Sequence, residues 1–177
     1  MKPKVLWIFR KTRHLTEAGI IAFLALFAIS FLLDYTTANQ KEIQGKVIKI
    51  YDGDTMTVIA NNEKLSIRMF GIDAPELKQK YGIESRDNLI KMCPLNSNIT
   101  LQVKDKDKYK RTVAVVICNG HNLNSKQVEN GFAWAYTDYS WAFYFKQKIA
   151  ESKKIGLWAD KTPMNPKNYR KQIKYKE

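Results

Sequence analysis

The amino-acid sequence predicts an α+β fold, mainly β in its core, built on a five-stranded closed barrel of the OB type with about three helices. Short segments of alternating apolar and polar side chains follow one another from about residue 45 onward. One helical segment separates the third strand from the fourth, and the other helical segments follow the fifth strand. An α+β sandwich of another topology is the alternative that these observations leave open.

An uncharged apolar segment, residues 18–33, follows a leader with five Lys or Arg side chains. This order is typical of an export signal whose N-terminus stays in the cytoplasm. As a helix the segment would be about 24 Å long, shorter than the roughly 30 Å hydrocarbon layer. We therefore expect residues 1–38 to be either a signal peptide cleaved after the small residues at 36–38 or a retained signal anchor.

Both outcomes place the rest of the chain across the cytoplasmic membrane. It would be periplasmic or secreted after cleavage, and membrane-anchored through residues 18–33 otherwise. A buried internal helix is the third alternative, but a core helix does not usually follow a basic leader.

Turn signals divide residues 39–160, which we expect to form the barrel domain. Asn61-Asn62 suits a two-residue hairpin turn, so the first three strands are expected to form an antiparallel meander. Pro94, Gly131 and Gly156 are placed to stop the helices. The predicted strands cover residues 45–51, 54–60, 63–72, 99–103 and 112–118, and the predicted helices cover residues 80–92, 122–130 and 139–154. Residues 161–177 hold two prolines and many lysines, and we expect them to be a mobile basic C-terminal tail.

The chain has a formal net charge of +13. This charge is not confined to the leader, because 25 basic and 15 acidic residues follow residue 38 and leave +10 there. So basic a surface attracts polyanions, with nucleic acid the first candidate partner and an anionic membrane the second. A charge that serves only solubility is the alternative.

Histidine is scarce, since His14 lies in the leader and His121 is the only other one. A two-histidine hydrolytic mechanism and a histidine-rich zinc site are therefore excluded for the folded part. Any metal ion there is expected to be one that prefers oxygen ligands.

Carboxylates gather where the third predicted strand ends. Asp73 and Glu76 flank a sharp turn there, and Asp54 lies in the turn before the second strand. Arg68 lies on the third strand itself, and Arg111 ends a charged loop farther along the chain. Carboxylate oxygens beside two guanidinium groups suit a hard cation and a phosphodiester.

Five motifs in order and spacing resemble the staphylococcal nuclease-like (thermonuclease) family over about residues 43–160. The motifs are Asp52-Gly53-Asp54-Thr55, Ile67-Arg68 with Gly71-Ile72-Asp73-Ala74-Pro75-Glu76, Asp107-Lys108-Tyr109-Lys110-Arg111, Gly131-Phe132-Ala133-Trp134-Ala135-Tyr136 and Gly156-Leu157-Trp158. The resemblance implies an OB-fold barrel with three helices. It also implies a calcium-dependent phosphodiesterase that hydrolyses DNA and RNA to 3′-phosphate ends with little sequence specificity.

The resemblance further implies a role for each matched residue. Glu76 would accept the proton of the attacking water or position that water, while the arginines would bind the phosphoryl oxygens. The implied calcium ligands are Asp54, Asp73 and the main-chain carbonyl of Ala74, the implied catalytic residues are Arg68, Glu76 and Arg111, and the implied substrate contacts are Lys108, Tyr109 and Tyr136.

Structural alternatives accompany these assignments. Asp54 and Asp73 could merely form turns, Arg68 could only pair with Glu76, and residues 104–111 could be a solvated loop. Lys110 also departs from the family pattern, which usually has glycine there. If the backbone needs a positive φ at this position, lysine costs about 1 kcal/mol and could displace the following arginine.

Cys93 and Cys118 are the two cysteines of the chain. In an exported protein they form a plausible disulfide between the end of the first predicted helix and the fifth strand. Such a bond would stabilise the fold by roughly 3 to 4 kcal/mol. Two buried thiols are the alternative.

Two other classes of function compete with the enzyme, which we expect to be a monomer. One is a non-catalytic nucleic-acid-binding barrel, and the other is a basic adaptor at the membrane surface. A binding module has no reason to keep Arg68, Asp73, Glu76 and Arg111 together, so their joint presence favours the enzyme.

Overall fold

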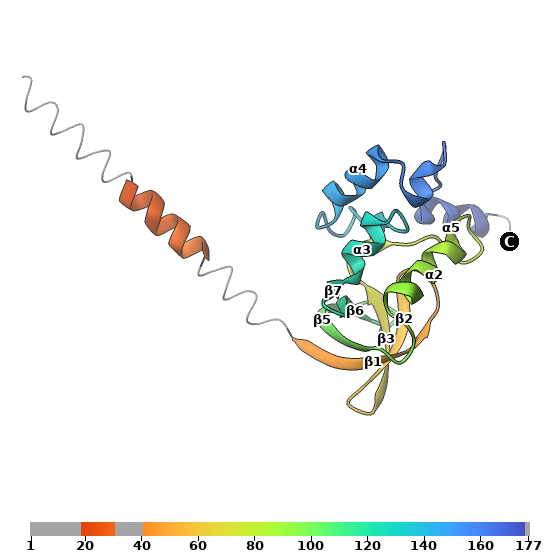
Figure 1. Ribbon diagram of the computed structural model, residues 1–177, viewed down its shortest axis with the longest axis horizontal. Helices are drawn as coiled ribbons and strands as arrows, with labels where there is room; N and C mark the ends of the chain where they lie inside the picture. Colours follow the sequence, from red (N-terminus) through yellow and green to blue (C-terminus); the bar gives the residue numbers. More distant parts are fainter. Residues whose placement is uncertain (1–18, 31–40, 176–177) are drawn as a thin grey trace, which may run out of the picture. The chain divides into compact units, whose positions relative to one another are not determined.

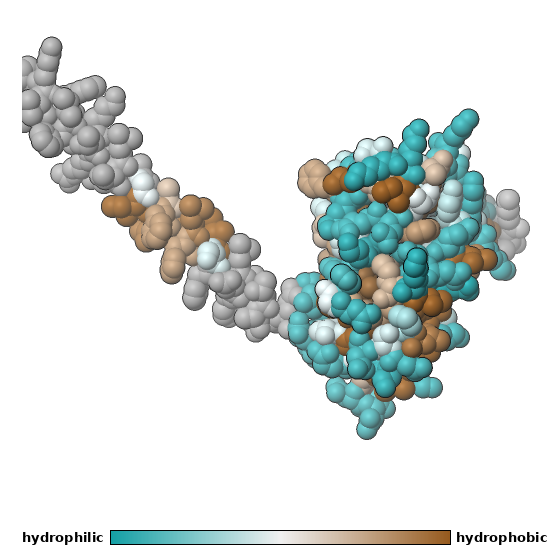
Figure 2. Space-filling model, viewed as in Figure 1, coloured by the Kyte–Doolittle hydropathy of each residue, from teal (hydrophilic) through white to brown (hydrophobic). Residues whose placement is uncertain are grey.

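The computed structural model of the protein describes residues 19–30 and 41–175 (Figure 1). The chain divides into two units, Met1–Gln40 and Lys41–Glu177. Residues 19–30 are helical with exposed apolar side chains, which give this helix a hydrophobic surface in Figure 2. Among the described residues, no helix combines the length and the apolar character needed to cross a membrane. The rest of the predicted export segment, including its cleavage site, lies outside the described residues.

Five strands of the second unit close into a barrel. Every pairing is antiparallel except that between the third and the last of these strands, which is parallel and closes the cylinder. The barrel strands are β1 (Glu42–Ile50), β2 (Thr55–Ala60), β3 (Glu63–Met69), β5 (Asn98–Lys106) and β6 (Thr112–Cys118). Two short strands, β4 (Ile72–Asp73) and β8 (Trp134–Ala135), pair beside the barrel, and β7 (His121–Asn122) extends β6. The structure thus confirms the predicted α+β fold with a closed five-stranded barrel.

The hairpin between β2 and β3 shows why the alternating sequence forms these strands. Met56 and Val58 are fully buried in the barrel, while Thr57 and Ile59, which alternate with them, face outward. Asn61 and Asn62 have φ values of 50° and 62°, as a two-residue hairpin turn requires. The predicted turn is therefore confirmed, and it sets the register in which Thr55 pairs with Arg68.

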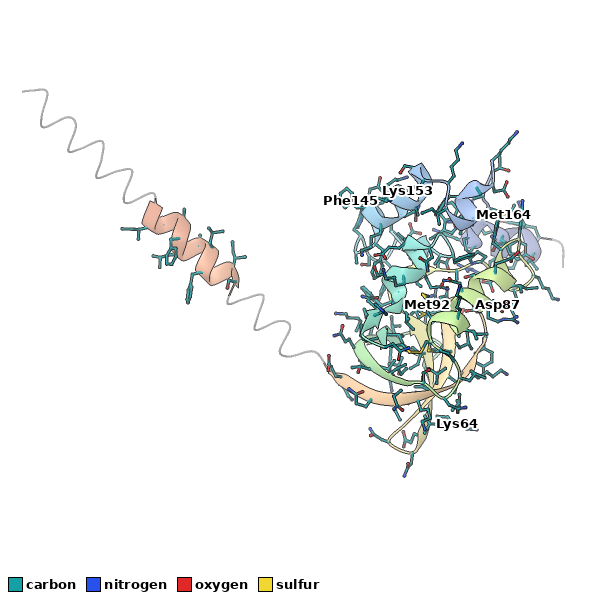
Figure 3. The ribbon with its side chains drawn as sticks, viewed as in Figure 1. Lys64, Asp87, Met92, Phe145, Lys153 and Met164 are labelled. Atoms are coloured by element: carbon teal, nitrogen blue, oxygen red, sulfur yellow. A yellow bond between two sulfur atoms is a disulfide. The ribbon has the colours of Figure 1, made fainter. Side chains whose placement is uncertain are left out.

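Helices gather at one end of the barrel (Figure 1). They are α2 (Gly82–Met92), α3 (Leu123–Glu129), α4 (Tyr144–Ser152), the short 3-10 helix η1 (Gly156–Ala159) and α5 (Pro166–Lys174). The helix expected over residues 139–154 begins only at Tyr144. Residues before it form turns that bring the Phe143 ring against Gly71, where an added Cβ would lie 3.1 Å from the ring. Phe145 on α4 and Lys153, the residue after this helix, point outward (Figure 3).

Helix α5 lies where the sequence suggested a mobile tail, so that expectation is wrong for residues 166–174. The helix starts with Pro166 in its first turn and with Asn165 as a capping residue that accepts a hydrogen bond from the backbone. The segment before it is fixed as well, because Gln79 Nε2 donates to the carbonyl of Met164 at 2.6 Å. Met164 is labelled in Figure 3. Residues 161–175 are therefore folded with the barrel domain.

One hydrophobic core fills the barrel and continues beneath α2 and α3, and a smaller one lies around Trp158. A disulfide joins Cys93, at the end of α2, to Cys118, at the end of β6, with their Cα atoms 6.0 Å apart. It closes a loop of about 25 residues, which corresponds to roughly 3 kcal/mol of stabilisation. Both cores and the disulfide lie in the second unit.

Candidate active site

All nine residues assigned by the sequence motifs line one pocket of about 460 Å³. They are Asp54, Arg68, Asp73, Ala74, Glu76, Lys108, Tyr109, Arg111 and Tyr136. Asp52, Thr55 and Arg170 complete its lining. The pocket lies at the rim of the barrel, where several strand ends meet, so residues far apart in the sequence share one small volume.

Two features of the barrel place the aspartates. The turn before β2 is tight because Gly53 has no side chain, and an added Cβ would lie 1.8 Å from the hydroxyl of Ser85. Asp54 follows this turn, and its backbone N–H donates to Asp52 Oδ1 at 2.9 Å. Asp73 lies on β4, which pairs with β8. Asp54 is therefore held by a tight turn, and Asp73 by strand pairing.

Arg68 joins the two aspartates. Its Nη1 lies 2.9 Å from Asp54 Oδ2, and its Nη2 lies 3.0 Å from Asp73 Oδ1. Arg68 projects from β3, and its side chain is only 16% exposed. The alternative that Arg68 pairs with Glu76 is not what the structure shows, since its ion pairs go to the aspartates.

Asp54 is buried and strongly hydrogen-bonded. Its Oδ2 accepts from the backbone N–H of Ala74 at 2.6 Å, and its Oδ1 accepts from the hydroxyl of Thr55 at 2.9 Å. Burial raises the pKa of Asp54 to about 6, outweighing the opposite effect of Arg68. Burial also raises the pKa of Asp73. The positive charge around these carboxylates therefore does not fully offset their removal from water.

Glu76 is bound by a third arginine, which the sequence did not point to. Arg170 of α5 places Nη1 2.9 Å from Glu76 Oε1 and Nη2 2.8 Å from Asp73 Oδ2. The Glu76 turn is also tied to the chain before α5. Gln79 accepts from the backbone N–H of Glu76 at 3.2 Å through its Oε1, while its Nε2 binds the carbonyl of Met164.

Arg111 reaches the pocket from the loop that leads into β6. Because β3 and β6 pair in parallel, the residue before β6 lies near Arg68. Asp107 fixes Arg111 through an ion pair of 2.7 Å to Nε and a hydrogen bond of 2.9 Å from the backbone N–H. Lys110 has a φ of 64°, so the backbone does take the conformation that favours glycine. Arg111 nevertheless lines the pocket, so Lys110 does not displace it from the site.

The expected substrate contacts surround these charged groups. Tyr109 is largely exposed and lies beneath both Lys108 Nζ, 5.2 Å from its ring centre, and the Arg111 guanidinium, 5.5 Å away. Tyr136 stacks near Tyr139, with ring centres 6.4 Å apart. The structure brings all three expected contacts to the pocket, and their role toward a substrate stays a prediction.

The donor set suits a hard cation with an incomplete protein shell. Within residues 19–30 and 41–175, no three Asp, Glu, His or Cys side chains converge as a metal cluster. The protein would therefore offer the carboxylates of Asp54 and Asp73 with the nearby main chain of Ala74. Water and substrate oxygens would supply the rest, an arrangement that Ca²⁺ and Mg²⁺ accept and structural zinc does not.

Arg170 is the site residue that the sequence analysis missed. The many lysines around it suggested a solvated tail, although Asn165-Pro166 is a strong local start signal for a helix. This start signal by itself predicts a helix at the position of α5. It would not have predicted the ion pairs with Asp73 and Glu76, because these join residues about 95 positions apart.

Comparisons with known proteins point to one family of nucleases. A family model described as staphylococcal nuclease homologue matches residues 66–160. An uncharacterized endonuclease of Haemophilus influenzae is 41% identical over 151 residues, which cover 82% of this chain and 84% of that protein. A micrococcal nuclease of Shigella flexneri is 30% identical over 167 residues, covering 87% and 95%, respectively.

An uncharacterized endonuclease of Escherichia coli O157:H7 is 35% identical over 128 residues, covering 71% of this chain and 83% of that protein. Together these similarities confirm the predicted enzyme class, a hydrolase of the nuclease type. This chain therefore belongs to the family of staphylococcal nuclease homologues.

Proposed function

We propose that this protein is a calcium-dependent phosphodiesterase that hydrolyses DNA and RNA to 3′-phosphate ends with little sequence preference. The observation that carries the proposal is that three acidic side chains line one pocket together with Arg68 and Arg111. A barrel that only bound nucleic acid would need the cations and aromatic rings, but it would gain nothing from carboxylates that repel the phosphates.

The arginines are suited to stabilise charge as it develops on phosphorus. Arg68 on β3 and Arg111, the residue before β6, line the same pocket, so both can donate to oxygens of one phosphate. Such donors contribute most when negative charge increases in the transition state. A bound calcium ion would add Lewis-acid polarisation of a phosphate oxygen and would orient a water molecule.

Glu76 is the carboxylate available to the attacking water. Asp54 and Asp73 are nearly buried, whereas the Glu76 side chain is 38% exposed at the pocket wall. It can accept a proton from water directly or hold that water in line by a hydrogen bond. Its contact with Arg170 fixes its position next to Asp73.

Low sequence specificity follows from the kind of contacts that the pocket offers. Lys108 and the arginines bind phosphate oxygens, which are the same in every nucleotide. Tyr109 and Tyr136 offer ring faces and hydroxyl groups to a neighbouring phosphate, sugar or base. DNA and RNA would therefore both be substrates.

The test is a cleavage assay with the full-length chain and single-stranded DNA. Calcium should support cleavage, a chelator should stop it, and the products should carry 3′-phosphate ends. Glu76→Gln should lose most activity while keeping its fold, and Glu84→Gln, a surface change on α2, should keep full activity. Cleavage that continues in chelator would overturn the metal-dependent mechanism, and nucleic-acid binding without cleavage would indicate the non-catalytic barrel.

We also propose that the barrel domain works outside the cytoplasmic membrane, delivered by residues 1–38. The basic leader, the apolar segment after it and the disulfide of the barrel domain support this location. Protease added to intact bacterial cells or spheroplasts that express the chain should digest it if it is exported. Full protection in spheroplasts would contradict export.

A further inference from the structure

A second hollow lies beside the active-site pocket, between α5 and the chain around Glu76. Its volume is about 440 Å³. Glu76 and Arg170 line both this hollow and the active-site pocket, so the two spaces are neighbours that share one wall. Nothing in the assigned roles uses the second hollow.

The charge of the second hollow is mainly positive. Lys78 and Lys174 line it together with Arg170. The acidic residues of its wall are Asp52, which caps the turn before Asp54, and Glu76. The charges of Glu76 and Arg170 offset each other in their ion pair, so the two lysines outweigh Asp52. This balance suits a phosphate group.

The remaining wall is aromatic and aliphatic. Tyr51 and Tyr169 contribute rings, and Leu77 and Ile173 contribute apolar side chains. Tyr51, Leu77 and Ile173 are each about 40% exposed, so their apolar surface is accessible from solvent. Lys49 lies 4.4 Å from the centre of the Tyr51 ring and adds a further cation at this edge. Tyrosine rings beside lysines form the combination that binds single-stranded nucleic acid through stacking and phosphate contacts.

We infer that this hollow is a subsite for a nucleotide that neighbours the cleaved phosphodiester in a single-stranded substrate. The inference rests on the proposed function, since it adds a second contact region to the same active site. A strand whose phosphate lies between Arg68 and Arg111 continues past Arg170 into the hollow. The volume is within the range of small-molecule sites and accommodates one nucleotide. Helix α5 thus contributes substrate affinity as well as a group in the active site.

The test compares a long and a short substrate. The double variant Lys78→Gln/Lys174→Gln removes two cations of the hollow. The matched control Lys91→Gln/Lys171→Gln removes two exposed lysines, from α2 and α5, that do not line it. KM is measured in the full-length chain for a single-stranded 12-nucleotide DNA and for a chromogenic thymidine phosphodiester too small to reach the hollow.

The subsite predicts a KM for the oligonucleotide raised about fivefold to tenfold in the first double variant, with kcat/KM for the small diester unchanged. The control should change both by less than twofold. Equal effects of the two double variants, or an equal change for both substrates, would overturn the inference.

Binding of the labelled oligonucleotide, followed by fluorescence anisotropy in chelator, separates this inference from the proposed function. If the wild type cleaves neither substrate, the proposed function fails. In that case, weaker oligonucleotide binding by the first double variant but not by the control still supports the subsite, and equal binding overturns it.

Discussion

Asp73 is held from two sides by arginines that come from very different regions of the molecule. Arg68 projects from barrel strand β3 and its side chain is 16% exposed, whereas Arg170 projects from helix α5 and is 42% exposed. The barrel arginine also binds the buried Asp54, and the helix arginine also binds the more exposed Glu76. The barrel therefore supplies the buried arginine of the site, and helix α5 supplies the arginine that solvent and ligands can reach.

The ion pairs of Arg68 and those of Arg170 should contribute differently to the free energy of unfolding, because the two side chains differ in exposure. Removing Arg68 would leave Asp54 buried without its ion-pair partner, which is among the costly changes in a protein. Removing Arg170 would leave Asp73 paired with Arg68 and Glu76 free to be solvated. Because solvent screens the more exposed pairs of Arg170, removing Arg170 should lower the free energy of unfolding less than removing Arg68 does.

Replacing Arg68 tests the barrel side of this contrast and has the largest expected effect. Arg68→Gln should lower kcat by roughly 10² to 10³-fold, because a donor to the developing phosphoryl charge is lost. It should also lower the free energy of unfolding by roughly 3 kcal/mol, measured by urea denaturation. Arg86→Gln, which breaks an ion pair at the surface, is the control and should cost less than about 1 kcal/mol. Near-wild-type activity of Arg68→Gln would refute the catalytic role.

Replacing Arg170 tests the helix side. A cation at Asp73 competes with the guanidinium that occupies the same carboxylate, so Arg170→Gln should bind calcium more tightly. Unit charges about 4 Å apart in water interact by about 1 kcal/mol, so we expect roughly a fivefold gain. Isothermal titration with calcium alone measures it without any substrate. Lys171→Gln, with the same charge change on the same helix, should bind as the wild type does; an unchanged or weaker affinity in Arg170→Gln would show that the helix is no competitor.

Lys110 directly precedes Arg111. Its replacement should have a smaller effect than the replacement of Arg68 or Arg170. Its φ of 64° is strained for lysine, so Lys110→Gly should stabilise the protein by up to about 1 kcal/mol. Activity should stay within twofold, because Asp107 rather than residue 110 fixes Arg111. Urea denaturation and kcat measure the two quantities. A loss of stability would mean that the lysine side chain stabilises the loop more than its backbone strains it.

Glu129 tests the packing of the helices on one another, with the smallest expected effect. Burial alone would raise its pKa, but hydrogen bonds from Lys126, Lys146 and Ser125 outweigh burial and lower the pKa to about 2. The ionised side chain therefore stabilises the fold above about pH 4.5, and this contribution is lost as the pH falls from 4.5 toward 2. Glu129→Gln should show a smaller fall in Tm between pH 7 and pH 3 than the wild type. An equal fall in both proteins would remove Glu129 from the acid response.

The barrel half of the molecule was predictable because its signals are local. Alternation within β2, the Asn61-Asn62 turn and the motifs at strand ends each act over a few residues. The sequence predicts that Arg68 lies near the carboxylates. It does not predict that Arg68 forms its ion pair with Asp54 rather than with Glu76. That choice depends on how the tight turn at Gly53 sets the depth of Asp54.

The helix half was harder because its contacts are distant in sequence. Helix α5 has a local start signal, yet its value to the site comes from Arg170 meeting Asp73, 97 residues earlier. The late start of α4 likewise depends on Phe143 packing against Gly71. Composition alone made the lysine-rich segment resemble a solvated tail.

The separation of Arg170 from Asp73 also bears on synthesis. The barrel strands leave the ribosome well before α5, so a nascent chain can fold its barrel while the carboxylates are balanced by Arg68 alone. During that interval Asp73 and Glu76 lack the ion pairs that Arg170 makes in the complete fold. The order of elements along the chain thus places the arrival of the Arg170 guanidinium after the synthesis of the barrel strands.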